Sequence, residues 1–207
     1  MIPAMLAKLM SYLLLGVVRF LTGSQARWYG CPPKAEQRIY FANHQSHADL
    51  VMIWAALPRE LRGITRPIAA KDYWTATPFK QWITTAVFNA VYVERERKGD
   101  EDPLQPLADA LTQGDSIILF PEGTRGHTGD PQAFKAGLYN LAQRFPQVVL
   151  VPAWINNIQR LLPKGEVIPV PVLCSVTFGA PIRLEQGEDR KVFLERAREA
   201  VIALRER

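Results

Sequence analysis

Two polar side chains five positions apart, His44 and Asp49, are the strongest candidates for chemistry in this sequence. The segment IYFANHQSHADL leads from a short apolar run, through a polar turn that contains His44, into a helical run that starts near Asp49. A carboxylate that accepts a hydrogen bond from one imidazole nitrogen fixes the tautomer and leaves the other nitrogen free to take a substrate proton. The spacing therefore predicts a general base, His44, that is oriented by Asp49.

The other polar residues of this turn have more than one interpretation. Asn43 and Ser46 could contact substrate, or their side-chain oxygens could cap the helix that follows. The histidines of the chain could form a metal site with the nearby aspartate, and they are His44, His47 and His127. Because the chain has only these three histidines and no matching carboxylate cluster, we predict no metal.

The sequence offers no obvious protein nucleophile to act with this base. The G-x-S-x-G turn of serine hydrolases is absent, and neither Cys31 nor Cys174 has a local catalytic signature. A base with an orienting acid but no nucleophile indicates direct attack by an activated substrate hydroxyl or by water. The two cysteines are also too few for a disulfide framework and lack the spacing of a zinc site, which is consistent with a reducing compartment.

A second polar turn, PEGTRG at residues 121–126, follows the apolar run SIILF. The planar fork of Arg125 matches two phosphate oxygens at once, and Thr124 with exposed amides could share them. Gly123 and Gly126 allow a positive φ and close backbone approach. Glu122 could orient the arginine or bind a substrate hydroxyl, or the two could form an ion pair that only stabilises the turn. The order of residues is not that of a P-loop.

Short apolar runs alternate with helical patterns through the rest of the chain. This alternation predicts an α/β domain with a mainly parallel sheet flanked by helices. The predicted strands are 39–42, 67–70, 91–94, 117–120, 148–153 and 172–178, and the predicted helices are 48–57, 78–88, 103–113, 134–145 and 189–206. Residues 155–171 are expected to form a long loop. Both polar turns follow predicted strands, where ligands bind in open α/β sheets.

An amphipathic helix is predicted before this domain, so that residues 1–24 and 25–207 form two parts. Residues 9–18 read LMSYLLLGVV between Lys8 and Arg19, which is shorter than the roughly 20 residues that a membrane-spanning helix needs. Apolar residues recur at helical spacing, so we expect the helix to lie in the membrane interface. The alternatives are a helix packed on the domain's own core and a signal peptide, although no A-x-A cleavage site follows.

The charge distribution agrees with a lipid partner. The chain has 207 residues, a formal net charge of +5 and a mean hydropathy of −0.06, which fits one globular domain and excludes a multi-spanning membrane protein. Residues 1–38 hold five basic groups and one acidic group, whereas residues 39–182 are balanced. No basic stripe runs over the body of the domain, so we predict no nucleic-acid partner. A basic edge beside an apolar segment suits an anionic lipid surface.

The two polar turns together resemble the glycerolipid acyltransferase family, whose best-known members are the lysophosphatidate (1-acylglycerol-3-phosphate) acyltransferases. The resemblance rests on Asn-His-x4-Asp followed some seventy residues later by Phe-Pro-Glu-Gly-Thr-Arg, and it covers roughly residues 38–155. It implies that His44 is the general base and that Asp49 orients it. It also implies that the phosphate of the acyl acceptor is bound by Glu122, Gly123, Thr124 and Arg125.

Further blocks extend the resemblance. NAVYVER looks like the family's glycine, hydrophobic triplet and arginine, which implies a phosphate-binding role for Arg95. Asn89 stands where the family has glycine, and Tyr92 where phenylalanine is common. The run LVP at 150–152 resembles a fourth block, and Lys71 in AAKDYW resembles a basic position near the same pocket.

The reaction that the resemblance implies is acyl transfer from acyl-CoA or acyl carrier protein to the free hydroxyl of a lysophospholipid, without a metal or bound cofactor. Lysophosphatidate is the first choice of acceptor, which implies an O-acyltransferase of phospholipid biosynthesis at the cytoplasmic face of the membrane. Glycerol-3-phosphate, another lysophospholipid or a lyso-ornithine lipid would use similar residues. Two other hypotheses are a hydrolase in which His44 activates water and a lipid-binding protein without catalytic activity.

Overall fold

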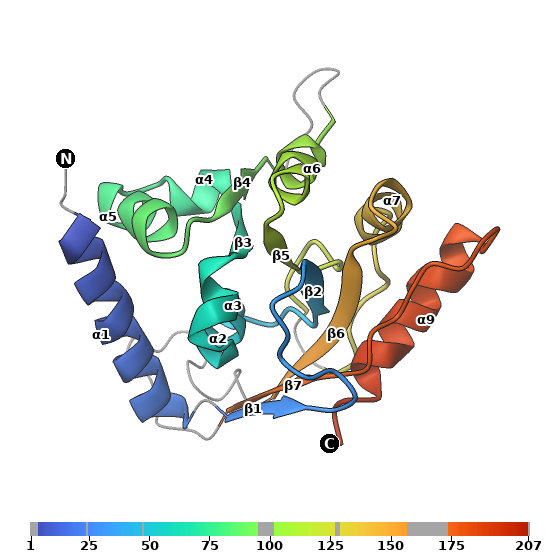
Figure 1. Cartoon of the computed structure of the whole chain (residues 1–207), viewed down its shortest axis with the longest axis horizontal. Coiled ribbons are helices and arrows are strands. Elements are labelled where there is room, and N and C mark those ends of the chain that lie inside the picture. The colour runs from blue at the N-terminus through green and yellow to red at the C-terminus, as the bar shows by residue number, and fades with distance from the viewer. Residues whose placement is uncertain are drawn as a thin grey trace.

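Seven strands form one sheet in the computed structural model, which describes residues 4–23, 25–46, 48–94, 102–126, 129–156 and 174–206 (Figure 1). The order along the sheet is β1-β7-β6-β2-β5-β3-β4. The strands are β1 Gln25–Trp28, β2 Arg38–Ala42, β3 Thr65–Ala70, β4 Val91–Val93, β5 Ser116–Leu119, β6 Val149–Asn156 and β7 Ser175–Phe178. The central strand β2 therefore lies between β6 and β5.

The sheet is mainly parallel, which confirms the predicted α/β fold. Strands β6, β2, β5, β3 and β4 run in the same direction, whereas β7 is antiparallel to β6 and carries β1 parallel to itself. Each of the six predicted strands corresponds to an observed one. The edge strand β1 is not apparent from the sequence, because QARW is mostly exposed and lacks an alternating apolar pattern.

Helices cover both faces of this sheet (Figure 1). One face carries α6, α7 and α9, and the other carries α1, α2 and the π-helical turn η1 that continues α5. The helices are α1 Ala4–Thr22, α2 Asp49–Ala56, α3 Arg59–Gly63, α4 Lys71–Trp74, α5 Pro78–Trp82, η1 Ile83–Val87, α6 Gln105–Thr112, α7 Gly137–Arg144 and α9 Arg190–Ile202. All the predicted helices are present, whereas α3 and α4 are too short to show a helical period.

Strand β2 contributes to both cores of the domain. Ile39 and Phe41 pack under α6, α7 and α9, and Tyr40 and Ala42 pack on the side of α2. All five residues of the strand are buried, as expected for a central parallel strand covered on both faces. The chain segment that leaves β2 is therefore anchored at a rigid position.

Local sequence signals determine several helix ends. The hydroxyl of Thr77 accepts a hydrogen bond from the Lys80 N–H at 3.3 Å, and Pro78 occupies the first turn of α5. Helix α6 ends before Gly114, whose φ of +88° is strained for other residues. The predicted loop begins later than expected, because β6 extends to Asn156; residues 157–171 lie outside the described residues.

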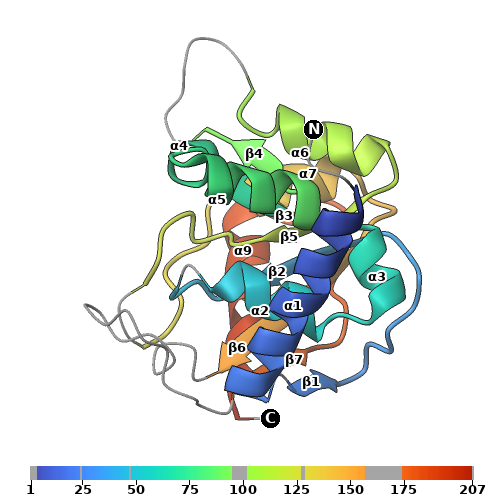
Figure 2. The same ribbon diagram turned by 90° about the vertical axis from the view of Figure 1, so that its left-hand side faces the viewer.

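Helix α1 lies along α2 and η1 and has two apolar sides (Figure 2). Leu15 is buried, and Leu14 and Val18 pack against the core under α2. The opposite side exposes large apolar side chains, including Leu9 at 64% and Phe20 at 86%. None of the helices in the described part of the chain is long and apolar enough to cross a bilayer. The helix thus packs on its own domain and also presents an apolar surface outward.

Candidate active site

The two polar turns meet at one edge of the sheet because β2 and β5 are parallel neighbours. Tyr40 pairs with Ile118, so both strands end at the same edge. The Gly126 N–H donates to the His44 carbonyl oxygen at 2.8 Å, and the His44 N–H donates to Glu122 Oε1 at 2.7 Å. Two backbone groups of His44 are therefore bonded to the second turn, which joins segments about eighty residues apart in sequence.

The predicted base and its orienting acid are in direct contact. The Nδ1 atom of His44 lies 2.9 Å from Asp49 Oδ2, and the same oxygen accepts from the N–H groups of Gln45 at 2.6 Å and Ser46 at 2.8 Å. Asp49 is fully buried at the start of α2. Because a carboxylate oxygen only accepts, this geometry places the imidazole proton on Nδ1 and leaves Nε2 as the basic nitrogen.

A second contact fixes the plane of the His44 ring. The ring stacks on Phe120 with a centroid distance of 4.4 Å and an interplanar angle of 18°. The side chain of His44 is 22% exposed, so part of the ring reaches the surface while Asp49 and Phe120 contact the rest. Phe120 has no predicted role in the sequence, but its position at the end of β5, beside β2, explains the contact.

Glu122 is buried and bonds the backbone instead of Arg125. Its Oε1 accepts from the His44 N–H, and its Oε2 accepts from the Gln132 N–H at 2.8 Å. Burial raises the pKa of this carboxyl above its ordinary value, against the opposing effect of the Gln132 and His44 N–H groups. The internal Glu–Arg pair considered from the sequence is not found between these described residues. Glu122 instead connects the turn that contains His44 to the segment that precedes α7.

The cationic part of the second turn is exposed. Thr124 and Arg125 both lie at the surface, and Arg125 has no ion-pair partner in the described part of the chain. Gly123 has a φ of +70°, and a Cβ built on it would lie 2.7 Å from Lys135 Nζ. The ammonium of Lys135 therefore lies directly over this turn. The sequence does not reveal Lys135, because it comes ten residues after Arg125 and reaches the turn only through the loop between them.

Asn43 and Ser46 both make local bonds. The Asn43 side chain is buried and bonds the Ile155 backbone in both directions, with its Oδ1 accepting at 2.8 Å and its Nδ2 donating at 3.2 Å. The Ser46 hydroxyl accepts from the Ala48 N–H at 3.2 Å. The Asn43 contacts hold the end of β2 against β6, and the Ser46 contact lies in the turn before α2. Contact of either residue with substrate stays a prediction.

The remaining basic candidates lie further along the same edge. Lys71 follows β3 and its ammonium bonds Glu94 Oε1 at 3.0 Å, instead of any group of the two turns. Arg95 lies outside the described residues. Asn89, at the position where the family has glycine, has a φ of +49°. Asparagine tolerates this left-handed conformation better than most residues, which explains how it can replace glycine there.

The histidine-based metal site cannot be assembled from the described residues. His47 and His127 both lie outside them. Within the described ranges, no group of three or more His, Cys, Asp or Glu side chains is placed to hold a metal ion.

The comparison with known proteins agrees with this arrangement of motifs. Residues 31–156 match the model of the family described as Acyltransferase, which is more than half of the chain and includes both polar turns. The chain belongs to the Acyltransferase family. The family assignment confirms the resemblance that the two turns indicate.

The sequence identity to individual members of the Acyltransferase family is modest. The chain is 28% identical over 195 residues to the 1-acyl-sn-glycerol-3-phosphate acyltransferase alpha of Ovis aries, covering 90% of this chain and 65% of that protein. It is 30% identical over 163 residues to the 1-acyl-sn-glycerol-3-phosphate acyltransferase of Cocos nucifera, covering 74% and 48%. The chain therefore spans less than two thirds of the length of these relatives.

A solved acyltransferase shares the fold. The crystal structure of the 1-acyl-sn-glycerophosphate (LPA) acyltransferase PlsC from Thermotoga maritima superposes with a TM-score of 0.72 at 21% identity. The match covers 96% of this chain and 78% of that one. At this identity the comparison establishes the fold, and the chemistry is argued from the site itself.

Proposed function

We propose that this protein is an O-acyltransferase that moves a fatty acyl group from a thioester, acyl-CoA or acyl carrier protein, to the free hydroxyl of a lysophospholipid. The observation that carries the proposal is the hydrogen-bonded pair of His44 and Asp49 next to the exposed turn of Arg125. The names of the relatives support 1-acylglycerol-3-phosphate as the acceptor and phosphatidate as the product. This places the enzyme in phospholipid biosynthesis.

In the proposed reaction, Nε2 of His44 removes the proton of the acceptor hydroxyl as its oxygen attacks the thioester carbonyl carbon. The carbon–oxygen bond forms, the carbon–sulfur bond breaks, and the proton held on His44 passes to the departing thiolate. Asp49 stabilises the protonated ring through the bond to Nδ1. General base catalysis of this kind typically contributes about 10²–10⁴-fold in rate.

Two backbone amides in the turn before α2 hold the carboxylate of Asp49. The N–H groups of Gln45 and Ser46 both donate to Asp49 Oδ2. They are therefore engaged in fixing the carboxylate, and we do not assign them to the oxyanion that forms on the thioester carbonyl.

The acceptor phosphate is assigned to the exposed cations of the second turn. Arg125 can bind two phosphate oxygens at once, and the ammonium of Lys135 lies over the same turn at Gly123. Thr124 adds a hydroxyl donor at the surface. Arg95 and Lys71 remain predicted contributors to this site, on the strength of the family resemblance.

The substrate's acyl chain stays in a bilayer, and α1 provides a surface for contact with it. Leu9, Leu13 and Phe20 expose their apolar side chains on the side opposite Leu15. A helix with this distribution lies in the interface with its apolar side in the acyl boundary. Since the thioester donors are cytoplasmic, we propose attachment to the cytoplasmic face of the membrane.

The test is an assay of acyl transfer with and without the lysolipid acceptor, using the wild type and His44→Ala. Wild-type protein is expected to form diacyl product only with acceptor, and His44→Ala to lose at least about 10²-fold in rate while its circular dichroism is unchanged. Release of the same amount of free fatty acid with and without acceptor would favour the hydrolase. Activity of His44→Ala within tenfold of wild type would exclude His44 as the base.

A further inference from the structure

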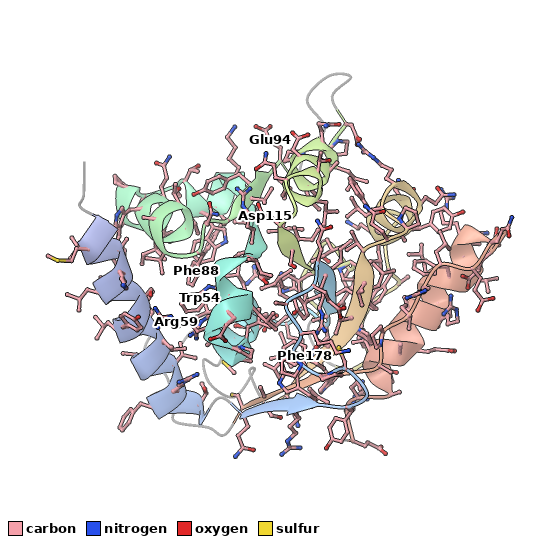
Figure 3. The ribbon with its side chains drawn as sticks, viewed as in Figure 1. Trp54, Arg59, Phe88, Glu94, Asp115 and Phe178 are labelled. Atoms are coloured by element: carbon pink, nitrogen blue, oxygen red, sulfur yellow. The ribbon has the colours of Figure 1, made fainter. Side chains whose placement is uncertain are left out.

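Three arginines from α1 and α3 are near enough to one another that the charges of Arg19 and Arg59 both act on Arg62. Arg19 lies near the end of α1, and Arg59 and Arg62 lie on α3, the helix beside α1 in Figure 2. Figure 3 shows Arg59 between α1 and α2. The guanidinium of Arg62 lies 5.2 Å from the ring centroid of Trp54, a buried residue of α2. The stacking holds the charge of Arg62 at a defined position.

Within the described part of the chain, Arg19, Arg59 and Arg62 form no salt bridge. The Nη1 atom of Arg62 is buried and has no hydrogen-bond partner among the described residues. Burial, followed by the neighbouring charge of Arg19, lowers the pKa of Arg62, and Glu60 provides the main opposing charge. A buried donor without an acceptor costs free energy, as does the repulsion of like charges. An anion bound beside the exposed side chains of Arg19 and Arg59 would relieve the repulsion of like charges.

The apolar side of α1 indicates which anion this is. Lys8, Tyr12 and Arg19 fall on one side of the helix. Lys8 lies about one turn before Tyr12, and Arg19 lies about two turns after it. That side adjoins the exposed apolar residues, of which Phe20 is the most exposed. Interfacial helices place apolar side chains among the acyl chains and basic side chains at the level of the headgroups. The arginines therefore lie where lipid phosphates would be.

This cluster is distinct from the proposed acceptor site. Asp49 begins α2 beside His44, whereas α3 follows the opposite end of α2 after Leu57 and Pro58. Eight helical residues separate the two ends by about 12 Å. The arginines of α3 therefore follow the end of α2 that lies away from Asp49 and His44.

We propose that Arg19, Arg59 and Arg62 form a binding site for the phosphate groups of anionic phospholipids, which makes membrane docking of this protein selective for anionic bilayers. The proposal rests on the membrane attachment put forward for α1 and deepens it. With the apolar side of α1 in the acyl boundary and the arginines at the headgroups, two elements fix the orientation of the protein on the surface. The other end of α2, which begins with Asp49 beside the base His44, is oriented with them.

The test is co-sedimentation of the purified full chain with vesicles of phosphatidylcholine alone and with vesicles of phosphatidylcholine and phosphatidylglycerol in equal amounts. Arg59→Gln and Arg62→Gln are each expected to bind the anionic vesicles about fivefold more weakly, and the double variant about 25-fold, with little change on neutral vesicles. Arg190→Gln, which removes an exposed charge from α9 on the other face of the sheet, is the matched control and should bind like wild type.

Two results would overturn the proposal. One is unchanged anionic-vesicle binding by the double variant, and the other is an equal loss on neutral vesicles, which would indicate damage to the apolar contact. Arg59 is exposed, so Arg59→Gln keeps the test valid even where loss of the Trp54 stacking destabilises Arg62→Gln. Because binding is measured without an acyl donor, His44→Ala should bind like wild type, which separates this result from the proposed reaction.

Discussion

The turn that contains His44 and the turn that contains Arg125 lie side by side but are built in opposite ways. His44 is held by a carboxylate, by two backbone hydrogen bonds and by the ring of Phe120. Arg125 and Lys135, in contrast, are exposed, and Arg125 has no ion-pair partner in the described chain. A base works only in one tautomer and direction, whereas a phosphate can be held by flexible cations through charge. Changes in geometry should therefore damage the first turn most, and changes in charge the second.

The largest effect is expected for Asp49→Asn. The amide can keep its oxygen in the place of Oδ2, where it accepts from the two N–H groups and from His44 Nδ1, but it carries no negative charge to stabilise the protonated ring. We therefore expect kcat to fall about 10²–10³-fold with little change in the acceptor KM. Steady-state kinetics measure this, with the exposed Asp109→Asn as the control. A loss of less than tenfold in a folded variant would show that the base does not need the negative charge of Asp49.

Glu122→Gln is expected to have the next largest effect, and on stability as well as rate. The amide nitrogen cannot accept from an N–H, so either the His44 or the Gln132 backbone group loses its buried partner. We expect a destabilisation of about 1–3 kcal/mol in denaturant unfolding and a fall in kcat of about ten- to a hundredfold. The exposed Glu199→Gln is the control. If only the acceptor KM rose, Glu122 would be a substrate ligand instead of a backbone connector.

Arg125→Ala should act on binding. Loss of a charge-assisted hydrogen-bond donor to phosphate is expected to raise the acceptor KM by about tenfold or more while kcat changes less. The thioester donor KM should stay the same. Arg190→Ala, which removes an exposed arginine elsewhere, serves as the reference. Equal acceptor KM values for Arg125→Ala and wild type would place the phosphate at another group.

The smallest effect is expected for Lys135→Gln. Its ammonium is exposed and screened by solvent, so the acceptor KM should rise about three- to fivefold at low salt, and the difference should shrink as salt is added. Lys135→Arg should restore most of the affinity because the charge is kept. A Lys135→Gln effect that is independent of salt, or that appears in kcat, would argue for a structural role.

Sequence patterns predicted most of the fold because buried strands form short apolar runs and the longer helices repeat apolar residues at helical spacing. The buried strand β2 and the helix α6, which is bounded by Pro and Gly114, are examples. The edge strand β1 and the short helix α3 could not be predicted from the sequence, because four or five residues are too few to show a pattern. Element positions in turn predicted that the two polar turns meet at one sheet edge.

The roles of individual polar residues were harder to predict. His44 and Asp49 are close in sequence, so their contact follows from one turn and one helix start. Asn43 bonds Ile155, 112 positions away, and Glu122 bonds the backbone of Gln132, and neither partner has a side chain that signals the contact. Polar residues that support the backbone and polar residues that bind substrate look the same in a sequence.

The most direct test of the base is to observe the protons of the His44 ring by nitrogen-15 NMR in the wild type and in Asp49→Ala. With the neutral ring, the wild type should carry its proton on Nδ1 and show an unprotonated Nε2, and Asp49→Ala, which lacks the acceptor, should lose this preference for the Nδ1 proton. A wild-type ring with its proton on Nε2 would contradict the proposal, because that nitrogen could not accept the proton of a substrate hydroxyl.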